Sequence, residues 1–310
     1  MSDIAQRFNR DMLTLSAPIE PYLEAQGVDV RRDTEFMSLV EPDTVLDAYR
    51  LQMAAGAQVL VTATRGITPA RLAHHGMEDR LEELAVAALT VAKAANPQHI
   101  LVEVWPCGLP LDPDSANSMK EHRDQYARVA RVFEAIDKPD AETGVTAFDG
   151  FLLAGFGDIP ALKAAIAGVR MVSDKPVFAS VVMDGEGHLD PKKTQTLEEA
   201  VAAMEEFGAD VAGFATFAGP EEAAQLARRA AAVTDLPLLV SLAVPPMAKG
   251  RRKARETGPY DTPETMLSAA SALRAAGVQF LRATSQAGPA YTAVLAAATT
   301  GFDVHRPAGE

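Results

Sequence analysis

The sequence predicts an α/β protein with the fold of a single (β/α)8 TIM barrel. Short apolar segments rich in Val, Ile and Leu alternate with longer segments whose apolar residues recur every three or four positions. This alternation is typical of parallel strands joined by helices. Eight such apolar segments occur in 310 residues, and a barrel of eight strands reaches this length as one domain. We therefore expect one domain over residues 1–310.

The predicted strands are short, and most are followed by a segment with helical spacing of its apolar residues. They cover residues 12–16, 59–64, 100–104, 150–154, 177–182, 211–216, 238–242 and 280–283. The predicted helices cover residues 78–95, 118–136, 159–172, 196–207, 220–233, 262–276 and 289–298. Each strand and the helix after it form one unit, and repetition of this unit closes the barrel.

Start and stop signals mark several of these helices. Thr196 with Glu199, and Thr262 with Thr265, place a capping oxygen before a first turn, which predicts that Thr196 and Thr262 begin helices. Glycines occur where a helix is expected to end, in Ala-Gly-Ala at 55–57, Phe-Gly-Ala at 207–209 and Ala-Gly-Val at 276–278. Glycine at this position adopts the left-handed conformation that closes a helix.

Two segments interrupt the alternation of strands and helices. Residues 137–147 are polar and precede the fourth strand, so we expect them at the lower rim of the barrel. Residues 244–260 form a basic loop rich in Pro and Gly after the seventh strand. They lie on the face that carries the active site in such barrels. This loop is either a lid or partner-binding segment, or a solvated excursion.

Composition and charge exclude several classes of protein. Apolar residues make up 48% of the chain, enough for a buried core. The formal net charge of -13 repels nucleic acid and acidic membrane surfaces, so we expect neither as a partner. We expect a cytoplasmic protein, because no apolar run is long enough to span a bilayer and the first residues lack a hydrophobic signal core. Cys107 is the single cysteine, which excludes an internal disulfide and a metal site made of several thiolates.

The candidate site residues follow the predicted strands, where barrel enzymes carry their chemistry. Arg65 and Arg282 are expected to form a positive spot that binds a small anion by bidentate pairing. The alternative is that each arginine pairs with a neighbouring acid, Glu103 or Asp158, as part of the scaffold. The same two acids are the candidates for handling a proton. The candidate substrate-binding hydroxyls are Thr62, Thr64, Thr216, Ser241, Thr284 and Ser285.

Two further residues at these strand ends can carry chemistry. His188 follows Gly185-Glu186-Gly187 and is either a general base or a surface histidine. Cys107 is a nucleophile, a metal ligand or a structural residue. The sequence does not show the spacing of a catalytic zinc site.

The order of several motifs resembles the homocysteine S-methyltransferase family over most of the chain. Residues 41–45 (EPDTV) and 55–64 (AGAQVLVTAT) are similar to the family's P-x-x-V, AGAD and T-N-T pattern. Residues 150–159 (GFLLAGFGDI) resemble its L-E-T-x-x-D stretch, and residues 260–264 (YDTPE) resemble its Y-x-x-T-P-E element. The resemblance implies a barrel and a methyltransferase.

The resemblance also implies three zinc-binding cysteines, in a G-I-N-C motif after strand six and a G-G-C-C-G motif after strand eight. The corresponding residues are 213–216 (GFAT) and 282–286 (RATSQ), so Thr216, Thr284 and Ser285 replace the cysteines. Ala154 and Ala63 replace a glutamate and an asparagine of the pattern, and residues 16–21 (SAPIEP) only approximate its D-G-x-M-G-T opening. Asp158, Thr62 and Thr64 are retained.

Hydroxyl groups do not replace soft thiolate ligands of zinc. We therefore expect no zinc and no ordinary zinc-dependent methylation of homocysteine. The first hypothesis is a divergent methyltransferase that acts on a small, anionic substrate, with a corrinoid protein as a partner. The second is a non-catalytic small-molecule-binding or regulatory barrel. A third, in which Cys107 and His188 bind zinc, is the least supported by the spacing. The sequence leaves the substrate and the oligomeric state open.

Overall fold

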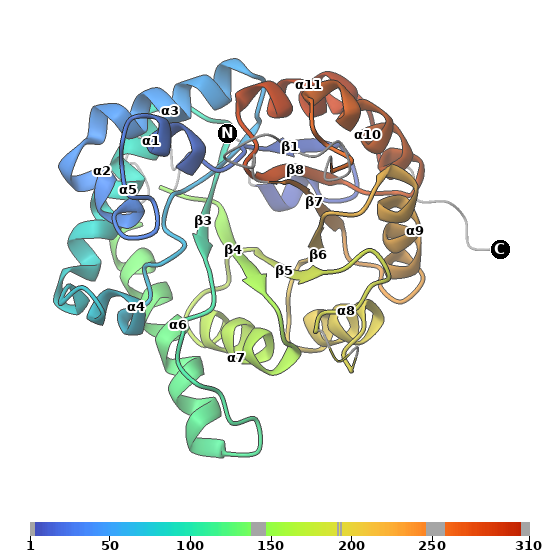
Figure 1. Ribbon diagram of the computed structural model, residues 1–310. Coiled ribbons are helices and arrows are strands. Elements are labelled where there is room, and N and C mark those ends of the chain that lie inside the picture. The colour runs from blue at the N-terminus through green and yellow to red at the C-terminus, as the bar shows by residue number, and fades with distance from the viewer. Residues whose placement is uncertain (1–3, 138–146, 191, 193, 246–257, 305–310) are drawn as a thin grey trace.

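The computed structural model describes residues 4–137, 147–190, 192, 194–245 and 258–304. Their strands form a closed parallel barrel in which each strand pairs with its neighbours in sequence and β8 pairs with β1. The predicted fold is confirmed (Figure 1). The strands are β1 (Leu13–Leu15), β2 (Val59–Val61), β3 (His99–Val104), β4 (Gly150–Phe156), β5 (Val177–Met183), β6 (Val211–Thr216), β7 (Leu238–Val244) and β8 (Phe280–Ser285).

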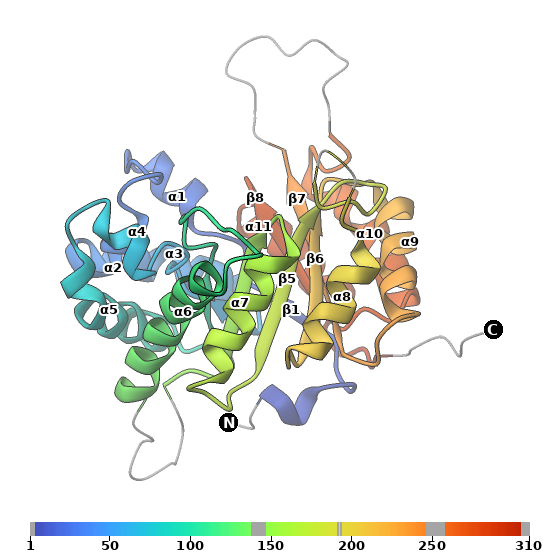
Figure 2. The ribbon, with the colours of Figure 1, turned by 90° about the horizontal axis from the view of Figure 1, so that it is seen from below.

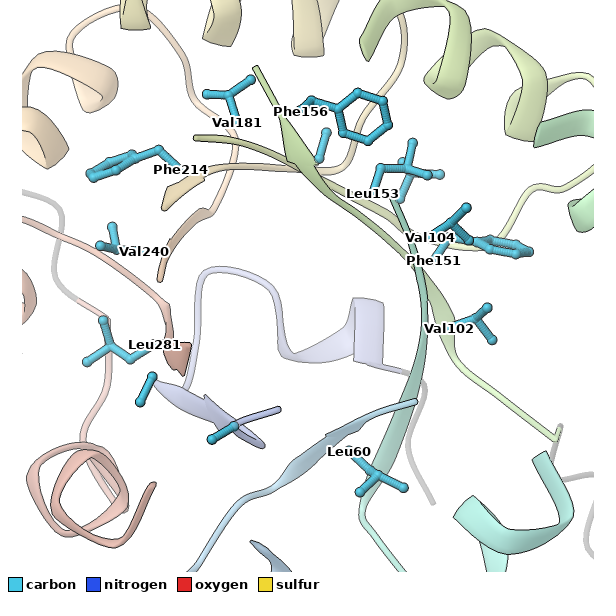
Figure 3. Close-up of a cluster of buried hydrophobic side chains, with 14 of the residues drawn as sticks. Leu60, Val102, Val104, Phe151, Leu153, Phe156, Val181, Phe214, Val240 and Leu281 are labelled. Carbon is cyan, nitrogen blue, oxygen red and sulfur yellow. The ribbon is translucent and has the colours of Figure 1, made fainter. Parts of the chain in front are cut away.

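Side chains alternate between the inside of the barrel and its helix-covered outside, because successive residues of a strand point to opposite faces. One buried cluster contains Val211, Leu239 and Phe280 with their counterparts on the other strands, and fills the barrel. A second cluster contains Phe214, Val240 and Leu281, which point away from the barrel axis toward the helices (Figure 3). This alternation assigns a face to each residue at the strand ends.

Helices follow the strands as predicted and surround the barrel (Figure 1). They are α1 (Glu20–Ala25), α2 (Thr34–Val40), α3 (Pro42–Ala54), α4 (Pro69–Ala73), α5 (Leu81–Ala94), α6 (Ala116–Ile136), α7 (Ile159–Arg170), α8 (Leu197–Glu206), α9 (Pro220–Ala231), α10 (Met266–Ala275) and α11 (Pro289–Thr299). Short 3-10 helices are η1 (Ile4–Arg7), η2 (Glu78–Arg80) and η3 (Pro263–Thr265). No range was predicted for α1 to α4, although the glycine at 56 was expected to close a helix, which is α3. These four helices lengthen the first two connections, where the periodicity is short and interrupted by proline.

The helix ends agree with the predicted signals, with one exception. Gly56, Gly208 and Gly277 all have φ between +82° and +94°, as expected for left-handed closing residues. Thr196 forms a complete capping box with Glu199 at the start of α8. Thr262 is the exception: its hydroxyl makes no capping bond, and the turn that follows is η3, not α10. The predicted start of that helix, residue 262, was therefore four residues before Met266, where α10 begins.

β1 and β2 are shorter than predicted: one backbone bond follows each strand, from Ser16 to Val59 and from Thr62 to Leu101, and side chains make further bonds there. Ser16 Oγ accepts the Val61 amide at 2.9 Å, and beyond Val61 two threonine hydroxyls bind the β3 backbone. β4, β7 and β8 instead run two residues past their predicted ends. The prediction for β6 agrees residue for residue.

The amino-terminal segment lies across the end of the barrel opposite the carboxyl ends of the strands (Figure 2). Ile4 belongs to the cluster inside the barrel. The Phe8 ring packs edge-on against Phe178 and Phe280, with ring centroids 5.9 Å away in both cases. This segment therefore closes the bottom of the core.

The two interrupting segments are described only at their ends. For the predicted loop at 137–147, residues 138–146 lie outside the described residues, and the Ala147 amide donates to Asp137 Oδ1. For the predicted basic loop at 244–260, residues 246–257 lie outside them. Val244 belongs to β7, and Tyr260 is fully buried. In the described ranges, no helix has both the length and the apolar character needed to cross a membrane.

Candidate active site at the barrel mouth

A buried ion pair crosses the inside of the barrel at the carboxyl ends of its strands. Arg282 is on the inner face of β8, and its Nη1 lies 2.6 Å from Glu103 Oε1 on β3, with Nη2 3.3 Å from Oε2. Arg282 Nε donates to the Ser16 carbonyl at 3.1 Å, and Trp105 Nε1 donates to Glu103 Oε1 at 3.2 Å. Both side chains are buried, so the two charges of this pair neutralise each other inside the protein.

Arg65 forms a second ion pair beside the first. Its Nη1 lies 3.2 Å from Glu20 Oε1, Nη2 donates to the Val30 carbonyl at 3.3 Å, and the guanidinium lies over the Trp105 ring at 5.1 Å. Burial of Glu20 raises the pKa of its carboxyl, while the charge of Arg65 opposes that shift. The Arg65 side chain keeps 25% of its surface exposed, whereas Arg282 is buried. Of the two arginines, Arg65 is therefore the one that a ligand can reach.

The two arginines do not form the predicted positive spot, because two carboxylates neutralise them. The alternative, in which Arg282 pairs with Glu103, is confirmed. Arg65 pairs with Glu20, which the sequence did not suggest because it lies in a helix that had not been predicted. Asp158 pairs with neither arginine within the described residues. Each of the two arginines thus has a carboxyl partner of its own.

Thr62 and Thr64 hold the Glu103 backbone. The Glu103 amide donates to Thr62 Oγ1 at 3.2 Å, and Thr64 Oγ1 donates to the Glu103 carbonyl at 2.8 Å. The two hydroxyls are 2.6 Å apart, so Thr62 donates its hydrogen to Thr64. Both residues are buried, and this closed ring fixes the β3 position from which Glu103 extends.

The three residues at the cysteine positions do not form a set of zinc ligands. Thr216 is buried, shares the outer strand face with Phe214, and its Oγ1 accepts the Ala218 amide at 3.1 Å. Thr284 shares the inner face with Arg282, and Ser285 lies at the end of β8 with φ of 62°. Neutral hydroxyls on different strand faces do not suit zinc, which prefers thiolate, imidazole or carboxylate ligands.

Apolar and small side chains complete the mouth. Ser241 is buried on the inner face and is in register with Arg282. Val182, at the end of β5, is 38% exposed, and Phe217, just after β6, is 50% exposed. Gly155 has φ of +77°, and a Cβ there would meet the Trp105 ring at 2.8 Å. The mouth therefore combines an internally paired charged floor with an apolar rim.

Asp158 lies apart from these ion pairs. It is the N-cap of α7, where its Oδ1 accepts the Ala161 amide at 2.8 Å. It also lines a cleft of about 450 Å³ between the loop after β3 and the start of α7. Cys107 lines the same cleft. Its thiol is buried, and burial raises its pKa, which agrees with the structural interpretation of Cys107.

His188 and Cys107 are not placed together for zinc. His188 Nδ1 lies 3.6 Å from Asp184 Oδ2 and 3.7 Å from Glu186 Oε2. In the part of the chain that the structure describes, these three residues form the group whose atoms could surround one cation, and Cys107 is not among them. Asp184 and Glu186 are exposed. Within the described residues, the structure therefore gives no support to zinc bound by Cys107 and His188.

Sequence reasoning missed Glu20 as a site residue and gave Trp105 no role. Trp105 stands two positions after Glu103 in an alternating strand, so the period of two places both on one face. That signal was present in the sequence. Glu20 lies after β1 and Arg65 after β2, so no pattern within a short stretch of sequence could indicate that these two residues form an ion pair.

Comparisons with known proteins agree with this architecture. The family model for homocysteine S-methyltransferase matches residues 15–299. The metallated form of the homocysteine methyltransferase MmuM from Escherichia coli has a TM-score of 0.71 at 17% identity, with 93% of this chain and 96% of that chain covered. Its apo form has a TM-score of 0.66 at 15% identity, with the same coverage.

A more distant likeness is restricted to the fold. The carboxyl transferase domain Y628A of Rhizobium etli pyruvate carboxylase has a TM-score of 0.51 at 12% identity, with 96% of this chain and 50% of that chain covered. No curated protein matches the chain in sequence. At these identities the structural likenesses show a shared barrel.

Proposed function

Because this chain belongs to the homocysteine S-methyltransferase family, we propose that it is a methyltransferase that acts without zinc on a small molecule at the barrel mouth. The observation that carries the proposal is the family match over residues 15–299 in a chain with a single cysteine. A zinc site of three thiolates needs three cysteines, so a relative without them requires another way to bind and activate its substrate. We include a cytoplasmic location in the proposal, as the single unpaired cysteine favours a reducing compartment.

We propose that the substrate is small and anionic, and that Arg65 binds its charged group. The partial exposure of Arg65 supports this role, since Glu20 occupies only part of its guanidinium. Glu103 is the acid that lies at the mouth and is the better candidate for handling a proton, whereas Asp158 caps a helix. Arg282 keeps Glu103 oriented. Ser241 is in register with Arg282, and Thr284 lies two residues further along the same face of β8.

A corrinoid protein is the proposed methyl carrier. The basis is the family membership and the apolar rim of the mouth, where Val182 and Phe217 expose surface that a partner can cover. Such a partner would present its methyl group to the carboxyl ends of the strands, where barrel enzymes bind their substrates.

The proposal is tested by methyl-transfer assays on metal-free protein. The protein is treated with a chelator, its zinc content is measured, and it is given methylated carboxylates or a methylated corrinoid, with homocysteine among the acceptors. We expect transfer at the same rate before and after chelation. Arg65→Met should raise KM for an anionic substrate by about tenfold, because a charge-assisted hydrogen bond is lost. Stoichiometric zinc with zinc-dependent formation of methionine would refute the proposal.

The second candidate, a non-catalytic binding or regulatory barrel, has one observation in its favour. The charged groups and several hydroxyls of the mouth are already bonded to each other. Thermal-shift screening with small acids, amines and methylated compounds, followed by product analysis of each ligand found, separates the two functions. Binding without any product favours the regulatory barrel, and turnover excludes it.

A further inference from the structure

The cleft beside Asp158 is a ligand-sized space on the face that carries the barrel mouth. It occupies about 450 Å³ between the segment after β3 and the start of α7. Leu109, Leu111 and Pro113 line one side and are partly or fully exposed, while Pro160 and Ala161 line the other. A ligand with an apolar body would therefore cover apolar surface that now faces water.

The polar groups of the cleft differ in whether they have a hydrogen-bonding atom left for a ligand. His122 has Nδ1 3.0 Å from the Ser118 carbonyl and Nε2 3.1 Å from the Leu109 carbonyl, so a backbone oxygen faces each ring nitrogen. A neutral imidazole donates to one of the two. Gln195 Oε1 accepts the Ile159 amide at 2.7 Å. Asp158 uses Oδ1 for the Ala161 amide, and among the described residues no donor is bonded to its Oδ2. This oxygen is the open acceptor of the cleft.

The start of α7 cannot bind an anion, although helix N-termini often do. The Ile159 amide is bonded to Gln195, the Ala161 amide is bonded to Asp158, and Pro160 has no amide hydrogen. No arginine or lysine is among the residues that line the cleft. Arg71 does not line the cleft and donates from Nε to the carbonyl of Pro106, a lining residue, at 2.6 Å. Asp158 is the one carboxylate among the residues that line the cleft.

We propose that this cleft binds a small ammonium compound with an apolar body, whose charged nitrogen donates to Asp158 Oδ2. The apolar part lies between the leucine side and the proline side of the cleft. The inference is independent of methyl transfer, because it concerns binding at a separate place and is measured without turnover. It gives Asp158 a role in ligand recognition in addition to its role as a helix cap.

The test uses three probes of similar shape and different charge: benzylammonium, benzyl alcohol and benzoate. Trp105, the single tryptophan, directly precedes Pro106 in the wall of the cleft and reports binding by its fluorescence; calorimetry gives an independent Kd. We expect benzylammonium to bind about tenfold more tightly than benzyl alcohol, as a charge-assisted hydrogen bond allows, and benzoate to bind most weakly. Equal binding of all three probes, a preference for benzoate, or no binding overturns the proposal.

Asp158→Asn is the decisive variant, because asparagine is as good an N-cap as aspartate but carries no charge. We expect it to keep the thermal stability of the protein and to lose the tenfold preference for benzylammonium. Glu121→Gln is the matched control, since it removes a nearby exposed carboxylate that does not line the cleft. Leu109→Ala should weaken benzylammonium and benzyl alcohol alike. A preference that survives Asp158→Asn would locate the cation elsewhere, such as near Glu20, and would also overturn the proposal.

Discussion

At the scale of single residues, the mouth is defined by charges that satisfy one another. Glu103 accepts hydrogen bonds from Arg282 and Trp105, and Arg65 forms an ion pair with Glu20. Removing one partner of such a buried pair leaves an uncompensated charge, which is costly. The two ion pairs therefore stabilise the fold as well as forming part of the candidate site. A substrate is expected to bind without breaking them.

Glu20 gives a prediction about pH. Burial raises the pKa of its carboxyl, so the folded state holds the proton more tightly than the unfolded state does. Both states are protonated below the ordinary glutamate value of about 4.3. As pH rises through the folded-state pKa, the wild type loses stability that Glu20→Gln retains. We expect the Tm of Glu20→Gln, relative to wild type, to be higher at pH 8 than at pH 4.

Thermal unfolding monitored by circular dichroism across this pH range measures the effect. Glu24→Gln is the control, because Glu24 is in the same helix and is exposed. The control should show no such trend. If the relative Tm of Glu20→Gln fell with rising pH, the ion pair with Arg65 would outweigh the cost of burial, contrary to our interpretation.

At the scale of elements, the helix starts show how far a local signal determines structure. The pattern of Thr196 and Glu199 is a complete capping box, whereas the similar pattern of Thr262 and Thr265 precedes η3. In the second case the Thr265 amide bonds to the Thr262 carbonyl, not to its hydroxyl. A glutamate three residues on makes the cap reciprocal, and Thr265 cannot supply that second bond.

This difference predicts unequal effects of two equivalent substitutions. Thr196→Ala should lower the free energy of unfolding by about 1 kcal/mol, the usual value of a lost N-cap. Thr262→Ala should change it by less than about 0.5 kcal/mol, because an exposed residue without a capping bond is replaced. Denaturation in urea, with equal m-values for both variants, measures the two changes. Similar losses from both substitutions would contradict the assignment of the caps.

At the scale of the whole molecule, the barrel is closed laterally by β8 against β1 and at the bottom by the amino-terminal segment. Phe8 connects this segment to β5 and β8 through its contacts with Phe178 and Phe280. These two strands are far apart in sequence. The segment is therefore expected to stabilise the assembled barrel and not any single strand and helix unit.

Phe8→Ala tests this role. We expect a loss of about 2 kcal/mol in the free energy of unfolding, less than for a fully buried phenylalanine because Phe8 is only partly buried. Phe302→Ala is the control: Phe302 is 45% exposed and contacts Arg274, so its loss should cost under about 1 kcal/mol. Both changes are measured by chemical denaturation. Equal losses would show that the contacts of Phe8 with Phe178 and Phe280 contribute no more to the free energy of unfolding than an exposed phenylalanine does.

The sequence by itself determined the barrel. The alternation of apolar periods is local, and every strand and helix that it predicted is present, from β6 at its exact residues to helices displaced by a few positions. One cysteine also means that a metal site of several thiolates cannot be built within a single chain. The family motifs pointed to the homocysteine S-methyltransferase family, which the match over residues 15–299 confirms.

Only the tertiary structure decided which charges meet. Arg282 reaches Glu103 across 179 positions of sequence, and Arg65 meets Glu20 from another connection. Strand periodicity assigns a residue to a face, but it does not say which side chains from different strands come within bonding distance. Electrostatic pairing depends on those distances. The closed barrel therefore decides that Glu103 pairs with Arg282 and Glu20 with Arg65, and that Asp158 keeps one carboxylate oxygen without a protein donor among the described residues.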